Sequence, residues 1–353
     1  ADSFAYMYEN FYEEIKINAD VEYFLNNGRL QFSQSAQIEI RGSSSSRNKM
    51  KSLGIAFNRK IDNSTYQIIN TAQALPGDNL NELQYVRLRN SGNDDGDTQF
   101  KDLALTNFVI ENGVDIELKY GSPVQVFVNS AYYGLLNFRT EINTIALSDL
   151  LQVNQTDITM LKMDNVTGNL EYKEGDEAVC EALRTAIKNK DAKTLEELVD
   201  VENFMDYLIV EDYFSNIDWP NNNVRLYKLP GEKFRCLLYD LDFGVFATKK
   251  QILPKMEFFE DDLSKMYQVF LEKNKAFETD FNARQKKWYT TFSSSHFQAI
   301  VDKLTEKHRG EIEYKIAQYH YPSNTLEWNL NIDFMRRNFE QNDKYNRSKY
   351  DLN

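Results

Sequence analysis

The chain has 353 residues, of which 42% are hydrophobic and 13% are aromatic, so it can bury about two sizeable cores. Only 6 prolines and 14 glycines are present, which argues against a linker-rich or low-complexity chain. The formal net charge of −13 argues against nucleic acid as the main partner, because duplex-binding proteins usually carry a basic face.

The cysteines and the hydropathy pattern exclude two further classes. Cys180 and Cys236 stand far from each other and from any histidine, whereas a zinc site needs about four close ligands, so we expect both to be small core residues. No run of about 18 apolar residues is present, so no transmembrane segment is predicted. No basic segment followed by an apolar one opens the chain, so no signal peptide is expected in it. Because the first residue is alanine, removal of a signal peptide on export is also consistent with the sequence.

Short alternating patterns dominate the first part of the chain. Strands are predicted at residues 37–40, 54–57 and 124–128. Turns or loops are predicted at residues 26–28, 43–46 and 90–97. In the last of these, Asp94, Asp95 and Asp97 could form a small ion site, but a solvated turn is the favoured interpretation.

After residue 149 the pattern becomes helical. Helices are predicted at residues 176–189, 194–198 and 201–215, strands at 224–228 and 234–241, and further helices from about residue 261 almost to the end. The chain is therefore predicted to be α+β, with a β-rich N-terminal lobe (residues 1–145) and a mostly helical C-terminal lobe (residues 146–353).

The most informative segment follows the long apolar helix predicted at 201–215. Asp218 stands in the loop after this helix, and Asn223 comes five residues later, where a strand opens. The next strand ends in Asp240 and Asp242. A hairpin can bring the start of one strand close to the end of the next, so these oxygen ligands can converge. Mg²⁺ prefers oxygen ligands, and phosphoryl transfer needs a metal on the phosphates and a carboxylate that accepts the hydroxyl proton.

Other interpretations of the same residues stay open. Aspartate and asparagine at helix ends often act as caps or form turns. The Asp240-Leu241-Asp242 segment alone also fits a solvated strand end, or the metal-binding motif of a glycosyltransferase that uses a nucleotide sugar.

Several ordered segments resemble the CotH kinase family, whose members are divergent relatives of protein kinases. The resemblance extends from about residue 35 to residue 340, which is most of the chain. Its blocks are residues 38–52 with the Arg-Gly-Ser-Ser-Ser stretch, Leu88-Arg89-Asn90 with Asp94 and 100–102, residues 123–134, Asp206-Tyr207 with 216–223, Asp240–Asp242, and Phe277, Phe281 and Arg284.

The resemblance implies a divergent two-lobed protein-kinase-like fold that binds ATP between its lobes. It implies transfer of the γ-phosphate, with Mg²⁺ or Mn²⁺, to a hydroxyl side chain such as serine on a surface or secreted protein. Transfer of AMP in place of phosphate stays open. A location outside the cytoplasm or on the cell surface is expected from the family alone.

The resemblance also assigns roles to individual residues. Asp218 corresponds to the catalytic base, and Asn223, Asp240 and Asp242 correspond to metal ligands. Lys51 corresponds to the lysine that contacts the α- and β-phosphates. The loop near the phosphates contains Arg41, Ser43, Ser44 and Ser45.

One departure from the family pattern affects function. The family's glutamate falls at Thr140, and Glu141 follows one residue later. A slip of one residue on a strand moves the side chain to the other face, so the usual pair with Lys51 is in question. This departure favours an alternative, a non-catalytic adhesin or assembly protein on the same fold.

The roles of three histidines and one tryptophan are inferred from their residue type alone. His296, His308 and His320 are expected to be structural or surface residues. For Trp219, packing under the loop and contact with a substrate are equally compatible with the sequence.

Overall fold

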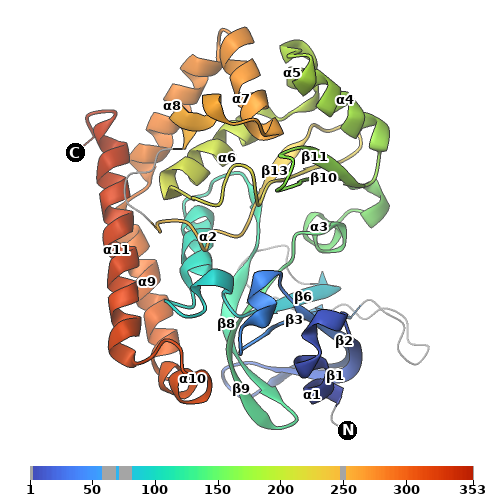
Figure 1. Ribbon diagram of the computed structural model, residues 1–353, viewed down its shortest axis with the longest axis vertical. Coiled ribbons are helices and arrows are strands. Elements are labelled where there is room, and N and C mark those ends of the chain that lie inside the picture. The colour runs from blue at the N-terminus through green and yellow to red at the C-terminus, as the bar shows by residue number, and fades with distance from the viewer. Residues whose placement is uncertain (1–2, 58–68, 71–81, 247–251, 353) are drawn as a thin grey trace. The chain divides into compact units, whose positions relative to one another are not determined.

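A computed structural model of the chain describes residues 3–57, 69–70, 82–246 and 252–352. The chain divides into two compact units, each assembled from three stretches. Unit 1 comprises Ala1–Leu103, Lys119–Val153 and Lys303–Ile332, and unit 2 comprises Ala104–Leu118, Asn154–Asp302 and Asp333–Asn353. Sheets and helices are both abundant, so the predicted α+β class is confirmed (Figure 1).

Unit 1 is built on a six-stranded antiparallel sheet with the order β1-β2-β3-β6-β9-β8. Its strands are β1 (Lys16–Phe24), β2 (Leu30–Arg41), β3 (Ser52–Ala56), β6 (Tyr85–Arg89), β8 (Gly121–Val128) and β9 (Ala131–Arg139). A separate pair joins β4 (Ile69–Asn70) and β5 (Glu82–Leu83). The strands predicted from alternation at residues 37–40, 54–57 and 124–128 are confirmed within β2, β3 and β8, although Phe57 lies just past β3.

Short helices and turns surround this sheet. They are α1 (Ser3–Glu9), η1 (Phe11–Glu13), η2 (Ser44–Arg47), η3 (Gly92–Asp94), α3 (Thr144–Leu151) and α10 (Ile312–Tyr319). The core of the unit is formed by side chains that alternate along the strands, including Leu53, Ile55, Val86, Leu136 and Phe138. Burial of this apolar face, at about 25 cal/mol per Å², is the main force that holds the sheet.

Unit 2 contains a five-stranded sheet with the order β11-β10-β12-β13-β7. Its strands are β7 (Glu117–Leu118), β10 (Thr159–Met163), β11 (Leu170–Glu174), β12 (Arg225–Lys228) and β13 (Arg235–Leu238). Only the β13–β7 pair is parallel. The predicted hairpin after the long helix is confirmed as β12–β13, with both strands slightly shorter than expected.

Four helices of unit 2 begin at an aspartate whose carboxylate accepts backbone N–H groups of the first turn. These are α4 (Glu177–Lys188), α5 (Ala192–Leu198), α6 (Val201–Phe214) and α7 (Asp262–Lys273), capped by Asp176, Asp191, Asp200 and Asp261. Each cap of this kind contributes about 1 kcal/mol. The helices predicted in this region are therefore confirmed, with boundaries that the caps explain.

The remaining helices include one in a region that was predicted to contain strands. They are α2 (Lys101–Glu111), η5 (Leu253–Phe258), α8 (Phe277–Thr291), α9 (Ser294–Arg309) and α11 (Thr325–Ser348). α2 is buried on almost every side, so it lacks the polar stripe that reveals a helix in a sequence. The strands β10 and β11 were not predicted, because β10 is likewise buried on both faces and has no alternation.

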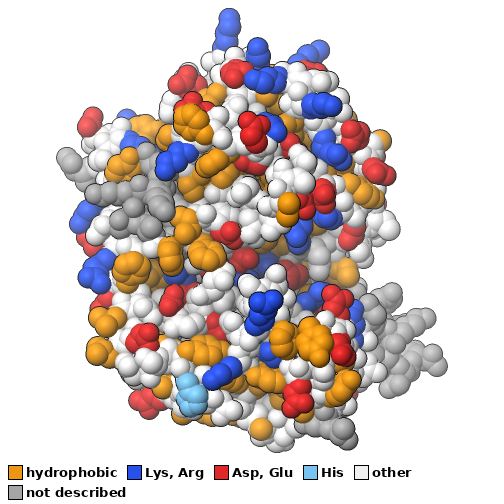
Figure 2. Space-filling view, viewed as in Figure 1, with side chains coloured by type: hydrophobic (Ala, Val, Ile, Leu, Met, Phe, Trp, Pro, Cys, Tyr) orange, Lys and Arg blue, Asp and Glu red, His pale blue; other side chains and the backbone are white. Residues whose placement is uncertain are grey.

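On the face shown in Figure 2, acidic and basic side chains are interspersed, with no broad basic patch. None of the helices in the described part of the chain has an apolar stretch long enough to cross a bilayer.

Candidate active site

The loop that carries Asp218 follows directly from α6. This helix ends at Ser215, which adopts a left-handed conformation with φ 52°. The amide Nδ2 of Asn216 then donates to Oε2 of Glu211 at 2.9 Å, and both side chains are completely buried. The other end of the same amide accepts from the backbone N–H of Asp218 at 3.3 Å. A buried amide therefore determines the path of the chain into the loop.

Trp219 packs underneath this loop. Its side chain is 2% exposed, and its indole N–H donates to the hydroxyl of Tyr207 at 3.1 Å. A buried indole with its one donor satisfied supports the loop from below. The packing interpretation of Trp219 is the one that its contacts support.

Asp218 is held from one side by two neighbouring amides. Nδ2 of Asn222 and Nδ2 of Asn223 each donate to Oδ2 of Asp218 at 2.9 Å. The other oxygen, Oδ1, accepts no hydrogen bond from the described residues. Partial burial raises the pKa of Asp218, the charge of Asp240 raises it further, and the two amides oppose both effects. The carboxylate is thus fixed in orientation and more basic than an exposed aspartate.

The β12–β13 hairpin brings Asp240 to the same place. Arg225 at the start of β12 lies opposite Leu237 near the end of β13, so Asn223 and Asp240 flank the same end of the hairpin. Both residues adopt left-handed conformations, with φ 56° and 63°, which asparagine and aspartate tolerate better than most residues do. The charge of Asp240 raises the pKa of Asp218, as expected for carboxylates at the same end of a hairpin.

Asp242 has a different environment from Asp240. Asp240 is half-buried, whereas Asp242 is 2% exposed and begins a turn. The turn is closed by the N–H of Gly244, which bonds to the carbonyl of Leu241 at 2.9 Å, and by the N–H of Val245, which bonds to the carbonyl of Phe214 at 2.7 Å. Of the two aspartates, Asp240 is therefore the one whose charge acts on Asp218.

The donor set of this loop fits a hard divalent cation. Within the described residues, no group of three or more His, Cys, Asp or Glu side chains lies together so that it could hold a metal ion. An open site is nevertheless what Mg²⁺ uses with nucleotides, since it keeps waters and phosphates as ligands beside one or two carboxylates. Two carboxylates that repel each other, next to an amide oxygen, form an all-oxygen set that a cation would stabilise.

The loop at residues 43–46, which we call the serine loop, follows a glycine that determines its shape. Gly42 has φ 133°, and a Cβ at this position would lie 2.6 Å from Oγ of Ser45, so a larger residue would displace the loop. Ser43 accepts the N–H and hydroxyl of Ser46 through its carbonyl. At the end of β2, Arg41 donates from Nε to the hydroxyl of Tyr85 at 3.0 Å and pairs with Glu39.

Lys51 is turned toward this serine loop. Its Nζ donates to the carbonyls of Ser46 at 2.8 Å and Asn48 at 3.3 Å. It also lies over the rings of Phe11, at 3.8 Å, and Tyr8, at 4.8 Å. Burial lowers the pKa of Lys51. Lys51 has no carboxylate partner among the described residues.

Glu141 has two other cationic partners instead. Its carboxylate pairs with Nζ of Lys119 at 2.8 Å and with Nη1 of Arg87 at 2.9 Å. Burial alone would raise the pKa of Glu141, but the charges of Lys119 and Arg87 outweigh burial and hold it well below its usual range. Thr140, the residue at the family's glutamate position, accepts the N–H of Tyr120 through its hydroxyl. A pair between Lys51 and Glu141 is thus absent, as the one-residue slip indicated.

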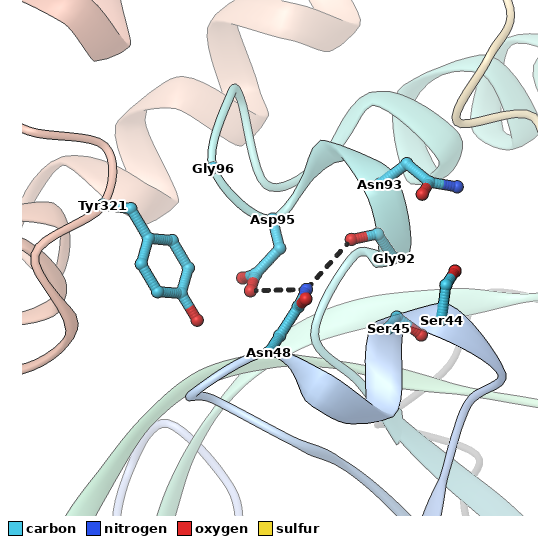
Figure 3. Close-up of a pocket in the computed structure, with 8 residues that line it drawn as sticks. All are labelled: Ser44, Ser45, Asn48, Gly92, Asn93, Asp95, Gly96 and Tyr321. Atoms are coloured by element: carbon cyan, nitrogen blue, oxygen red, sulfur yellow. Dashed lines mark hydrogen bonds between the residues drawn. The ribbon is translucent and has the colours of Figure 1, made fainter.

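Two of the predicted phosphate-contacting residues line a polar cavity of about 320 Å³ in unit 1. Its lining residues are Ser44, Ser45, Asn48, Gly92, Asn93, Asp95, Gly96 and Tyr321. Figure 3 shows the amide of Asn48 between the carboxylate of Asp95, at 3.1 Å, and the carbonyl of Gly92, at 3.4 Å. Asn48 thereby connects the segment that follows the serine loop to the loop at 90–97, and Asn48, Asp95 and Gly92 all line the cavity.

The interpretation of Asp94 and Asp95 as a solvated turn is wrong. Both are at most 1% exposed. Asp95 forms a buried ion pair with Lys315, which comes from α10. Asp94 accepts the N–H of Thr98 at 3.1 Å and the N–H of Lys101 at 2.9 Å. The sequence could not reveal the pair with Lys315, because its partners are 220 positions apart.

The cysteines and two of the histidines have environments that accord with structural roles. Both cysteines are buried and free. His308 is buried, its Nδ1 lies 2.8 Å from the carbonyl of Leu304, and burial lowers its pKa to about 4. His296 has a carboxylate partner that the sequence did not suggest, since its Nε2 lies 2.7 Å from Glu111.

Comparison with known proteins identifies the family of the chain. A search of the curated proteins finds no match. The family model described as CotH kinase protein matches residues 38–346, which include both the serine loop and the loop of Asp218. The chain therefore belongs to the CotH kinase family.

Proposed function

We propose that the chain is an atypical kinase that transfers the γ-phosphate of ATP, with Mg²⁺ or Mn²⁺, to a hydroxyl side chain of a surface or secreted protein, with serine as the expected acceptor. Membership of the CotH kinase family supports a kinase-like phosphotransferase. The two-lobed kinase-like organisation, with a division near residue 145, is part of this proposal.

The observation that carries the proposal is the state of Asp218. One of its oxygens is held by Asn222 and Asn223, while the other accepts nothing from the described residues. An oriented carboxylate with one open oxygen and a raised pKa suits a general base. In the proposed step the hydroxyl oxygen attacks the γ-phosphorus, its proton passes to Asp218, and the bond to the β-phosphate oxygen breaks to release ADP.

The metal is assigned to the same loop. Asn223, Asp240 and Asp242 would hold Mg²⁺ or Mn²⁺, which would neutralise charge on the phosphates. Asp240 also keeps Asp218 basic through its negative charge. Because Asp240 is the aspartate that acts on Asp218, we assign it as the principal ligand and Asp242 as the second.

In unit 1, the family resemblance assigns the phosphates to Arg41, Ser43, Ser44, Ser45 and Lys51. The serines and the backbone around Gly42 allow close approach of a phosphate. The contacts of Lys51 with Ser46 and Asn48 place its charge directly behind this loop. We therefore propose that Lys51 acts on the phosphates through the loop it supports.

A labelled-transfer assay tests this function. The purified chain is incubated with a serine-containing protein and with ATP labelled at the γ- or α-position, with and without Mg²⁺ or Mn²⁺. Metal-dependent incorporation of the γ-label is expected. Incorporation of the α-label would show AMP transfer, and no incorporation of either label under any metal condition would contradict an enzymatic function.

A second candidate is a non-catalytic assembly protein on the same fold. The observation that favours it is that Glu141 pairs with Lys119 and Arg87, while Lys51 lacks a carboxylate partner among the described residues. This candidate predicts no turnover with the architecture intact. The labelled-transfer assay separates it from the kinase.

A further inference from the structure

Two cations lie side by side on the sheet of unit 2. Lys162 in β10 is the register partner of Arg225 in β12, and directly opposite residues of antiparallel strands project on the same face. Both side chains are partly buried. Neither makes an ion pair with a carboxylate within the described part of the chain.

Arg225 is held in place by an aromatic ring. Its guanidinium carbon lies 5.3 Å from the centroid of the Tyr239 ring, which is 8% exposed. The Nε of Arg225 is buried and has no hydrogen-bond partner among the residues described. A buried donor without a partner raises the free energy of the folded chain. A ligand that accepts a hydrogen bond from this guanidinium would therefore be favoured.

The two carboxylates whose charges act on Lys162 are already engaged. Glu171 lies opposite Lys162 in β11, but its Oε2 pairs with Nζ of Lys173 at 3.0 Å. Asp164 accepts the N–H groups of Val166 and Thr167, in its own turn. The charges of Lys162 and Arg225 are therefore not compensated by direct contact.

The electrostatics of Lys162 agree with this picture. Burial makes the largest contribution to lowering the pKa of Lys162, and the charges of Arg225 and Lys173 lower this pKa further. Asp164 and Glu171 oppose these effects. A bound anion would relieve the repulsion between the two cations.

The pair borders the loop of Asp218. Arg225 follows Asn223 by two residues, and Tyr239 immediately precedes Asp240. Strand β12 begins and strand β13 ends at this place. A group bound by the two cations would therefore lie near the proposed catalytic carboxylate, within unit 2.

We propose that Lys162 and Arg225 form an anion subsite that binds a phosphate group. The planar guanidinium can donate two parallel hydrogen bonds to phosphate oxygens, and lysine adds a point charge. The phosphate can belong to the nucleotide or to an acceptor that is already phosphorylated. Binding at this subsite requires neither metal nor catalysis, so it goes beyond the proposed transfer reaction.

Calorimetric titration of the full chain with inorganic pyrophosphate, without metal or nucleotide, tests the subsite. We expect Arg225→Met and Lys162→Met each to weaken pyrophosphate by about 10- to 100-fold, the range of a lost charge-assisted hydrogen bond. Methionine keeps the apolar packing against Tyr239, and Arg225→Lys, which keeps the charge but not the two parallel donors, should retain only part of the affinity. Lys173→Met is the matched control, because Lys173 lies on the same sheet but is already paired with Glu171.

Two further titrations identify the source of the phosphate. ADP is compared with adenosine, and a phosphoserine peptide is compared with the same peptide containing serine. Loss of ADP affinity in the Arg225 and Lys162 variants assigns the subsite to the nucleotide, and loss of phosphopeptide affinity assigns it to the acceptor. Equal affinity of wild type and both methionine variants for pyrophosphate, ADP and phosphopeptide would overturn the proposal.

The outcome is independent of kinase activity. A chain without turnover still binds pyrophosphate if the subsite exists. If the chain is an active kinase but Arg225→Met and Lys162→Met leave its affinity for pyrophosphate unchanged, the proposed subsite is contradicted and the proposed kinase function is not.

Discussion

Replacing Asp218 by asparagine is expected to reduce phosphoryl transfer by about 10²- to 10⁴-fold, the usual contribution of a general base. The amide cannot accept the hydroxyl proton, although it can still accept hydrogen bonds from Asn222 and Asn223. It also removes the repulsion between Asp218 and Asp240. The free energy of unfolding is therefore expected to stay within about 1 kcal/mol of wild type. Initial rates of labelled transfer and urea unfolding measure the two effects.

Asn222→Ala is the graded control for this prediction. It removes one of the two hydrogen bonds to Oδ2 of Asp218 and leaves the carboxylate in place. We expect a loss of about tenfold or less, equivalent to one hydrogen bond of about 1 kcal/mol. Full turnover in Asp218→Asn would rule out Asp218 as the base and move the assignment to another carboxylate.

Replacing Glu141 by glutamine is expected to lower the free energy of unfolding by about 3–5 kcal/mol at pH 7. The change removes the carboxylate that pairs with both Lys119 and Arg87 in unit 1, and the side chains of these two cations are only 5% and 15% exposed. Removing one partner of a buried ion pair is more destabilising than replacing both partners by apolar residues, because the remaining charge stays buried after it has lost that partner.

The same variant has a defined pH dependence. The pKa of Glu141 is depressed in the folded chain, so its stabilising contribution is fully present above its ordinary pKa of 4.5. The contribution is lost as the pH falls through the lower folded-state pKa. The difference between wild type and Glu141→Gln should therefore be constant above about pH 5 and shrink at more acidic pH.

Urea unfolding at a series of pH values measures this difference. Glu171→Gln is the control, since its pair with Lys173 is 47% and 42% exposed and should be worth less than about 1 kcal/mol. A difference for Glu141→Gln that is small at pH 7, or that does not change with pH, would show that the cluster does not stabilise unit 1.

Much of the fold follows from local signals in the sequence. Strand alternation was visible at residues 37–40 because Ile38 and Ile40, which pack against the core of unit 1, alternate with the polar Gln37 and Glu39. The helices α4 and α5 were visible because exposed polar residues break their apolar runs, and Asp176, Asp191 and Asp200 mark where α4, α5 and α6 begin. The β12–β13 hairpin followed from two short apolar strands around a turn.

What the sequence did not show depends on burial and on distant contacts. α2 and β10 are surrounded by protein, so neither has the periodicity that distinguishes a helix from a strand. The ion pair of Asp95 with Lys315 joins residues that only the folded unit brings together. The same holds for Glu141, whose lysine is Lys119 rather than Lys51.

In the candidate site, too, some features could be predicted from the sequence and others depend on the folded structure. The spacing of Asp218 and Asn223, and the strand that ends before Asp240, suggested a site because the hairpin brings these segments together. The environments that separate Asp240 from Asp242, and the uncompensated pair of Lys162 and Arg225, come from strand register and burial. A local spacing motif does not contain that information.

The most direct test of the central claim is the unfolding midpoint of the chain in ATP, with and without Mg²⁺ or Mn²⁺, for wild type and Asp240→Asn. Asparagine suits the left-handed conformation of residue 240, so the backbone should be preserved. Asp164→Asn serves as the control, because it removes a carboxylate from a surface turn of the same unit.

We expect ATP with the metal to stabilise the wild type by about 2.7 kcal/mol at a ligand concentration one hundred times Kd, and by clearly less when the metal is left out. The Asp164→Asn variant should show the same shift, and Asp240→Asn should lose most of it. No shift in any metal condition, or an equal shift in Asp240→Asn, would contradict a metal-dependent nucleotide site at the loop of Asp218.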